Sequence, residues 1–188
     1  MGIRIQNKFG FSLLEVVMVI SILGIIVPAM FSMYFASMRA QRKVIVLRDT
    51  KRNGDNALST IESLIKQNAV SIHNAAPPTG SNQVCTNSIP TASCTELFFK
   101  DKDGTWFSFV TSNSKIASNS GALLGSTSGY LTNDKSIVSL FDLRCSYISD
   151  ASPALVSITF TIAQNGPTGR PEDISSLNYQ TKVKLRSY

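Results

Sequence analysis

The hydrophobic pattern divides this chain of 188 residues into three parts, and the first is a long apolar run. From Phe11 to Met38 the only charged residue is Glu15. As a helix, these ~28 residues extend roughly 42 Å, which exceeds the hydrocarbon core of a bilayer, about 30 Å. The run therefore predicts a transmembrane helix. A kink or loosened turn is expected near Ile25–Pro28, because proline removes a backbone hydrogen bond.

The second part, 39–73, is predicted to continue the helix with one amphipathic face. Its apolar residues recur three or four positions apart, as in a helix that is buried on one side. One signal opposes a continuous helix, because the Asn-Gly pair within Lys51–Asn56 is typical of a turn. We therefore expect a kink near Gly54, with Asp55 capping a second helix, and an end of the helical region at Ala75–Gly80. The apolar stripe consists of Ala57, Leu58, Ile61, Leu64, Ile65 and Ala69.

The third part, 74–188, shows the alternation of half-buried antiparallel strands. ELFFK and TWFSFV flank DKDG, which predicts a hairpin with Gly104 at its turn. Ser112–Asn133 is rich in Ser, Gly and Asn and is interpreted as loops around a short strand or 3₁₀ turn. Three clearer strands follow. Their inward side chains are predicted to be Ile137, Phe141, Leu143, Cys145 and Tyr147, then Val156, Ile158, Phe160 and Ile162, and last Leu177, Tyr179, Thr181, Val183 and Leu185.

Together these parts predict an α+β fold. A long N-terminal helix, transmembrane in its first half, would pack its second half against an antiparallel β-sheet.

Charge is concentrated next to the apolar run. The formal net charge is +6. Basic residues that flank a hydrophobic helix ordinarily contact lipid headgroups. The part after residue 75 has scattered charges of both signs and no basic face with interleaved aromatics, so nucleic-acid binding is not indicated. The flanking cations are Arg4 and Lys8 on one side, and Arg39, Arg42, Lys43, Arg48, Lys51 and Arg52, opposed by Asp49, on the other.

The three cysteines are too few for a disulfide scaffold. Cys85 and Cys94 bracket a short loop with a proline, and a local disulfide between them is expected if the domain lies outside the cytoplasm. The alternative is two unpaired thiols. Cys145 falls on the apolar side of a strand and is expected to be a small buried residue.

Catalytic chemistry has little support in the sequence. The single histidine, His73, precedes a Pro-Pro loop and is interpreted as a surface residue. One histidine and three scattered cysteines do not make a closed zinc site, and DKDG lacks the later glutamate of a calcium loop. Gly125–Gly129 is similar to a nucleophile elbow but has threonine at its centre. We expect no enzyme, no metal and no cofactor.

The N-terminus admits three interpretations. A cleaved secretory signal has a basic start and a short apolar stretch, but this run is too long and carries Glu15. A simple signal anchor fits the length and leaves Glu15 unexplained, although a buried charge costs about 2.5–3.5 kcal/mol. In the third interpretation Met1–Gly10 is a basic leader that is removed before Phe11.

The segment G-FSLLEVVMVISILGII resembles the N-terminal signature of type IV pilins and type II secretion pseudopilins. The resemblance implies that a prepilin peptidase cuts between Gly10 and Phe11 and N-methylates Phe11. It also implies that Glu15 pairs with the N-terminal amine of a neighbouring subunit in a helical bundle. A carboxylate in an apolar bundle is strongly destabilising unless paired, so it fixes the axial register.

The end of the chain sharpens this resemblance. VSLFDLRCSYIS, ALVSITFTI and NYQTKVKLRSY are similar to the end of J-type minor pseudopilins and the corresponding minor pilins. These are thought to act at a filament tip or initiation complex. Only Cys145 lies beyond residue 94, so the C-terminal disulfide loop of many major pilins is missing. Secretion, pilus and competence systems all remain open.

The implied organisation is a leader over 1–10, a transmembrane and assembly helix over 11–38, its amphipathic continuation over 39–73 and a β-rich domain over 74–188. Partners would be the prepilin peptidase, other pilins or minor pilins, the inner-membrane assembly platform and, before assembly, membrane lipid. The protein would be a single-pass inner-membrane protein with its domain outside the cytoplasm, and then part of a periplasmic or cell-surface filament. The alternative is a membrane-anchored receptor or adhesin-like module that does not assemble.

Overall fold

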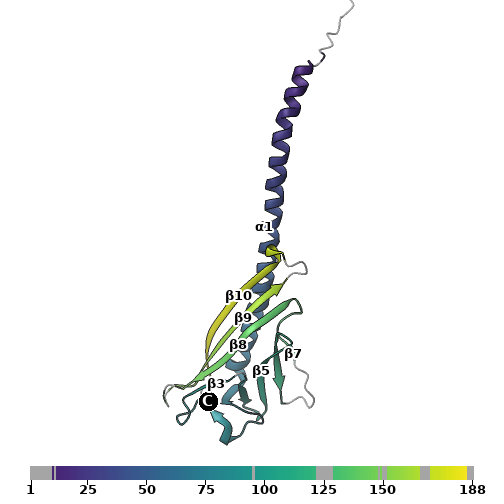
Figure 1. Ribbon diagram of the computed structural model, residues 1–188. Helices are drawn as coiled ribbons and strands as arrows, with labels where there is room; N and C mark the ends of the chain where they lie inside the picture. The colour runs from purple at the N-terminus through teal and green to yellow at the C-terminus, as the bar shows by residue number, and fades with distance from the viewer. Residues whose placement is uncertain are drawn as a thin grey trace, which may run out of the picture. The chain divides into compact units, whose positions relative to one another are not determined.

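The computed structural model describes residues 10, 12–94, 96–121, 129–147, 149, 152–165 and 170–185. The chain forms two compact units, Met1–Gln41 and Arg42–Tyr188. One helix, α1 (Leu13–Asn68), contributes to both. The second unit combines the remainder of α1 with antiparallel sheets, so the predicted α+β fold is confirmed (Figure 1).

α1 differs from the prediction in two places. It is helical through Gly54, so the predicted break with a second helix capped by Asp55 is wrong. It also ends at Asn68, and the predicted continuation to residue 73 is wrong for its last residues, which form strand β1 (Ala69–His73). β1 contains the β-branched Val70 and Ile72 and pairs on both sides, so sheet hydrogen bonds replace the helical ones. The helix also continues through Pro28.

A six-stranded antiparallel sheet has the strand order β2-β1-β4-β5-β6-β7. The predicted hairpin is confirmed, with Phe99 opposite Phe107 and Gly104 at a φ of 82°, which favours glycine. Strand β6 lies in the stretch that was interpreted mainly as loops. The strand was missed because its Ser- and Asn-rich sequence has no clear alternation of apolar and polar residues. The remaining strands are β2 (Gln83–Val84), β4 (Phe98–Asp101), β5 (Trp106–Ser112), β6 (Lys115–Ser120) and β7 (Gly129–Tyr130), and a 3₁₀ turn, η1 (Gly80–Asn82), precedes β2.

A four-stranded antiparallel sheet has the order β10-β9-β8-β3. Its inward residues on β9 are those predicted, and each is fully buried. On β10 the predicted inward residues, from Leu177 to Leu185, are also confirmed as buried or partly buried. The strands are β3 (Thr91–Cys94), β8 (Ser136–Ser146), β9 (Leu155–Asn165) and β10 (Ile174–Lys184), and the turn η2 (Pro171–Asp173) precedes β10.

The predicted inward face of β8 is correct for only part of the strand. Cys145 is buried, but Ile137 is 40% exposed and Val138 is buried in its place. A β-bulge between Ser139 and Asp142 adds one residue to β8 relative to β9, so the residues before it face the opposite side. The other predicted residues, Phe141, Leu143 and Tyr147, are buried or partly buried.

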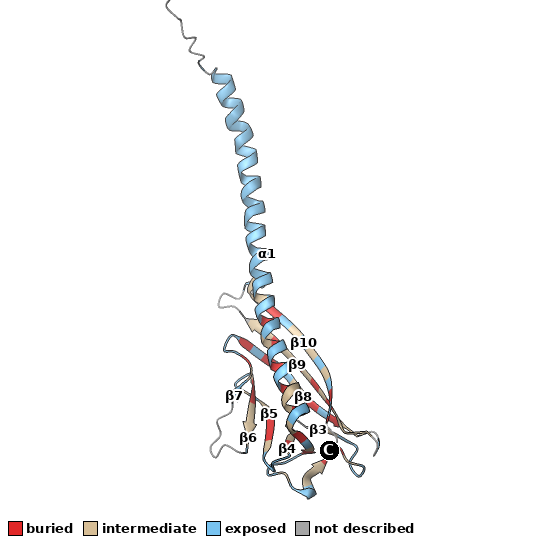
Figure 2. Cartoon of the chain, turned by 180° about the vertical axis from the view of Figure 1, so that it is seen from behind, coloured by how far each residue is buried: buried red, intermediate tan, exposed pale blue. Residues whose placement is uncertain are grey.

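The hydrophobic core lies where the second part of α1 meets both sheets (Figure 2). Ala57, Ile61 and Ile65 of the predicted helical stripe are fully buried. Large side chains of both sheets join them, among them Phe99 and Phe160. Burial of such a side chain contributes about 1.5–3 kcal/mol, so this stripe holds the helix on the sheets.

Candidate functional site

The first candidate site is the apolar part of α1. Every described residue from Ser12 to Ile45 is exposed, including the large aliphatic and aromatic side chains of the apolar run. This is the one described helix that is long and apolar enough to cross a membrane. An apolar surface of this extent is stable in lipid or against other apolar helices, and not in water.

Glu15, the one charged residue of the apolar run, lies in the first turn of α1. Its backbone N–H donates to the carbonyl of Ser12 at 3.0 Å, and its side chain is exposed. The positive end of the helix dipole favours an anion at this position. Gly10 is exposed and precedes the helix, whereas Phe11, the residue of the cleavage and methylation predictions, lies outside the described residues.

A close approach between α1 and β10 explains the Asn-Gly pair that was interpreted as a turn. A Cβ atom on Gly54 would lie 2.3 Å from Cε2 of Tyr179. The Tyr179 hydroxyl donates to the carbonyl of Lys51 at 3.0 Å, and its ring stacks on Phe160 at 5.0 Å. Burial, reinforced by the Asp55 carboxylate, raises the pKa of Tyr179 to about 12. Gly54 is therefore required for space and not for a turn.

Side-chain hydrogen bonds fix α1 along β10 on either side of this contact. Thr50, which is fully buried, hydrogen-bonds to the Ser175 hydroxyl. Thr181 donates to a Glu62 carboxylate oxygen at 2.7 Å. This bond, together with Lys66, lowers the pKa of Glu62. Lys43 donates to the carbonyl of Pro171 in η2 and to that of Ile174 at the start of β10.

A polar groove lies beside this helix–sheet contact. Its volume is about 560 Å³. The groove is lined by residues of α1, of the loop between β7 and β8, and of β9. These residues are far apart in the sequence, and no local pattern predicted the groove. The lining residues are Asp49, Arg52, Asn53, Asn56, Asn133, Asp134, Lys135 and Gln164.

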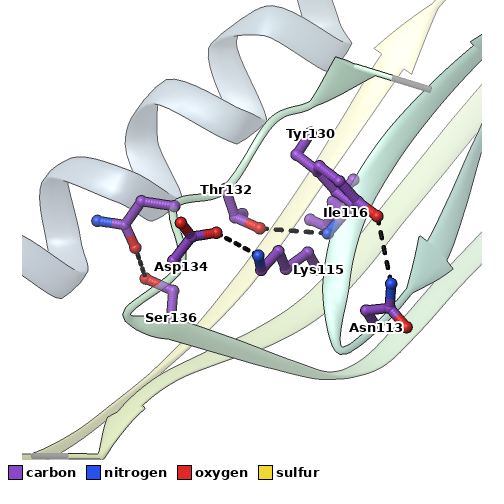
Figure 3. Close-up of polar contacts among 8 residues, drawn as sticks. Asn113, Lys115, Ile116, Tyr130, Thr132, Asp134 and Ser136 are labelled. Atoms are coloured by element: carbon purple, nitrogen blue, oxygen red, sulfur yellow. Dashed lines mark hydrogen bonds and ion pairs between the residues drawn. The ribbon is translucent and has the colours of Figure 1, made fainter. Parts of the chain in front are cut away.

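Hydrogen bonds hold the loop wall of the groove in place (Figure 3). Lys115 of β6 forms an ion pair with Asp134 and lowers the pKa of that carboxyl. The Thr132 hydroxyl accepts from the backbone N–H of Ile116 at 3.3 Å. Asn53 Nδ2 of α1 donates to the Ser136 hydroxyl at 3.3 Å. The loop is thus connected to both the sheet and the helix.

The disulfide differs from the predicted one. Cys85, which follows β2, is bonded to Cys145 of β8, with 6.0 Å between their Cα atoms. The predicted Cys85–Cys94 bridge is wrong, and the Cys94 side chain lies outside the described residues. Proximity in sequence was misleading because folding brings together residues that are 60 positions apart. The bridge links the two sheets.

His73 is buried, with 3% of its surface exposed, so its predicted place on the surface is wrong. Its Nδ1 lies 2.8 Å from Asn82 Oδ1 and its Nε2 lies 2.8 Å from the Ser71 hydroxyl. An amide oxygen is an acceptor only, so Nδ1 carries the proton and Nε2 accepts from Ser71 in the neutral ring. His73 thus holds the end of β1 to the η1 turn.

The described residues contain no group of three or more His, Cys, Asp or Glu side chains that could hold a metal ion. Of the Gly125–Gly129 segment, only Gly129 lies within the described residues. No family model, no curated protein and no solved structure matches the chain.

Proposed function

We propose that this protein is a minor pilin or pseudopilin subunit of a type IV filament-type machine, with a non-enzymatic role in assembly. The observation that carries the proposal is Glu15, in the first turn of α1, because the part of the helix that follows it, residues 16–38, is apolar, exposed and without any other charge. The sequence pair Gly10-Phe11 stands one residue, Ser12, before that helix, in the order of the prepilin signature. A plain anchor gains nothing from this charge, whereas a helical bundle gains a fixed register.

Two further observations support the proposal. The same helix continues beyond the apolar run and packs against antiparallel sheets, which is the pilin-like layout. The Cys85–Cys145 disulfide favours an oxidising compartment, and so a domain outside the cytoplasm. The proposed partners are the prepilin peptidase, other minor subunits and the inner-membrane assembly platform. The proposed location is the inner membrane, followed by a periplasmic or surface filament.

N-terminal mass spectrometry after co-expression with a prepilin peptidase tests the proposal. We expect loss of Met1–Gly10 and one added methyl group on Phe11. A Gly10→Val control should abolish both changes, because it replaces the residue before the proposed scissile bond. An intact N-terminus in the presence of active peptidase would contradict the proposal and favour a plain anchored module.

Glu15 variants separate processing from assembly. Glu15→Gln should be cleaved and methylated normally, but its recovery with other minor subunits should fall by at least about tenfold, because an uncompensated amine remains in an apolar bundle. Glu15→Asp keeps the charge and should recover part of the assembly. For both variants, assembly is measured by co-purification with other minor subunits from membranes, normalised to the amount of processed subunit. Normal recruitment of Glu15→Gln would contradict the proposed role of this carboxylate.

A further inference from the structure

The last strand of the fold, β10, forms a long uncovered edge. It pairs with β9 alone over 11 residues without a register shift (Figure 1). The opposite edge, β3, has 4 residues, and the edges of the other sheet, β2 and β7, have 2 residues each. Natural proteins ordinarily shorten or cover edge strands, because unpaired backbone groups template pairing with other chains. Among the four sheet edges in the described part of the chain, β10 is the exception.

The hydrogen bonds establish which backbone groups of β10 point outward. Leu185 donates its N–H to the carbonyl of Ala154 at 2.9 Å, which continues the ladder with β9. Residues of an antiparallel pair alternate between bonding to the partner strand and pointing away from it. Odd-numbered residues of β10 therefore bond to β9 and even-numbered residues point away. Ile174 fits this alternation, because its carbonyl accepts from Lys43 Nζ.

The outward backbone groups beyond Ile174 are free to bind another strand. Within the described chain, no hydrogen bond reaches the outward N–H or C=O groups of the even-numbered residues from 176 to 184. Their side chains are exposed on the face opposite α1, because Tyr179 and Thr181 contact the helix from the other face. These outward residues are Ser176, Asn178, Gln180, Lys182 and Lys184.

We propose that β10 binds an extended, acidic strand of another polypeptide by β-strand addition. Main-chain hydrogen bonds supply the affinity in such complexes, and alternate side chains supply the specificity. Lys182 and Lys184 have no acidic partner in the described part of the chain. They lie on one face two residues apart, so acidic residues at positions i and i+2 of the added strand complement them.

This inference concerns the sheet domain and holds whether or not the N-terminal helix is processed or assembled. Peptide binding to the full chain in detergent micelles tests it. The probe is a fluorescein-labelled peptide as long as β10, with alternating threonine and valine and a central Glu-Thr-Glu. One control peptide carries Lys-Thr-Lys, and another has N-methyl groups on alternate amides. We expect the fluorescence anisotropy of the acidic peptide to rise to saturation as the protein is added. The dissociation constant of each control peptide should be at least about tenfold higher.

A pair of variants at Gln180 separates the backbone from the side chain. Gln180→Pro removes an outward N–H that makes no bond to β9, so the sheet should tolerate it. Gln180→Ala removes only the side chain. We expect Gln180→Pro to lose peptide binding and Gln180→Ala to keep it, with unchanged thermal unfolding. If proline lowers the unfolding midpoint, the charge reversals Lys182→Glu and Lys184→Glu replace it, and together they should reverse the preference between the two peptides.

Three outcomes would overturn the proposal. The first is an absence of saturable binding by the acidic peptide. The second is equal peptide binding by a stably folded Gln180→Pro chain, or an unchanged preference after charge reversal. The third is a disulfide-linked homodimer of Gln180→Cys that excludes the peptide, since this would assign the edge to a second copy of the chain.

Discussion

At the scale of single residues, Gly54 determines how closely α1 approaches β10. Glycine in a helix interior ordinarily costs about 1 kcal/mol relative to alanine. Here the missing Cβ leaves space for the Tyr179 ring, which stacks on Phe160 and bonds to the backbone of α1 at Lys51. The packing gained at this contact offsets the weak helix propensity.

Gly54→Ala should therefore destabilise the domain despite its better helix propensity. Overpacking of a filled contact costs about 1–3 kcal/mol, so we expect the free energy of unfolding to fall by roughly 1–2 kcal/mol. Denaturant unfolding followed by circular dichroism measures the change. In a Tyr179→Ala background the clash is removed, and Gly54→Ala should then be neutral or stabilising. A loss of the same size in both backgrounds would contradict the contact.

At the scale of elements, the bulge in β8 sets which side chains of that strand face the core. Leu140, within the bulge, has a φ of 57°, and its side chain is 71% exposed. A non-glycine residue in the left-handed region costs about 1–2 kcal/mol. Burial of Val138 and Cys145, which the bulge directs to the same side, compensates for this strain.

Leu140→Gly should stabilise the domain. It relieves the left-handed strain, while the greater freedom of glycine in the unfolded chain offsets part of the gain, which leaves about 0.5–1 kcal/mol. Leu140→Ala is the matched control, because it removes the exposed side chain and keeps the strain, and it should change stability little. Chemical unfolding of both variants in one buffer measures the difference. Equal effects of glycine and alanine would exclude the backbone explanation.

At the scale of the whole molecule, the Cys85–Cys145 disulfide closes a covalent loop between residues that are 60 positions apart. It joins the loop after β2 to β8, and so joins the two sheets. Cross-links of this kind stabilise chiefly by restricting the unfolded chain, by about 2–4 kcal/mol. We expect Cys145→Ser to lower the free energy of unfolding by this amount.

Non-reducing peptide mapping, together with denaturant unfolding, checks the disulfide prediction. The wild-type chain should yield a cross-linked peptide that contains Cys85 and Cys145, and Cys94→Ser should yield the same one. A bridge lost in Cys94→Ser, or a Cys145→Ser variant as stable as the wild type, would contradict the pairing.

Features that depend on local pattern were predictable from the sequence. The apolar run, the helical stripe around Ile61 and the alternation of β9 each reflect a period of 3.6 or 2 residues. The hairpin at Gly104 follows from local turn chemistry. Glu15 could be singled out because a charge in an apolar run is conspicuous without any structure. The apolar helix, its buried stripe, the Gly104 hairpin and the alternation of β9 are therefore encoded by residues that lie close together in the chain, and Glu15 stays a prediction made on the same local grounds.

Features that depend on distant residues were decided only by the tertiary structure. Gly54 has the local signature of a turn, and only the Tyr179 ring, from a strand far along the chain, gives it a reason to lie within a helix. Cys85 has a nearer candidate partner, but packing of the two sheets brings it to Cys145. The uncovered edge of β10 depends on strand order, which alternation does not encode. Local periodicity specifies which side of an element is buried, and long-range packing specifies what lies against it.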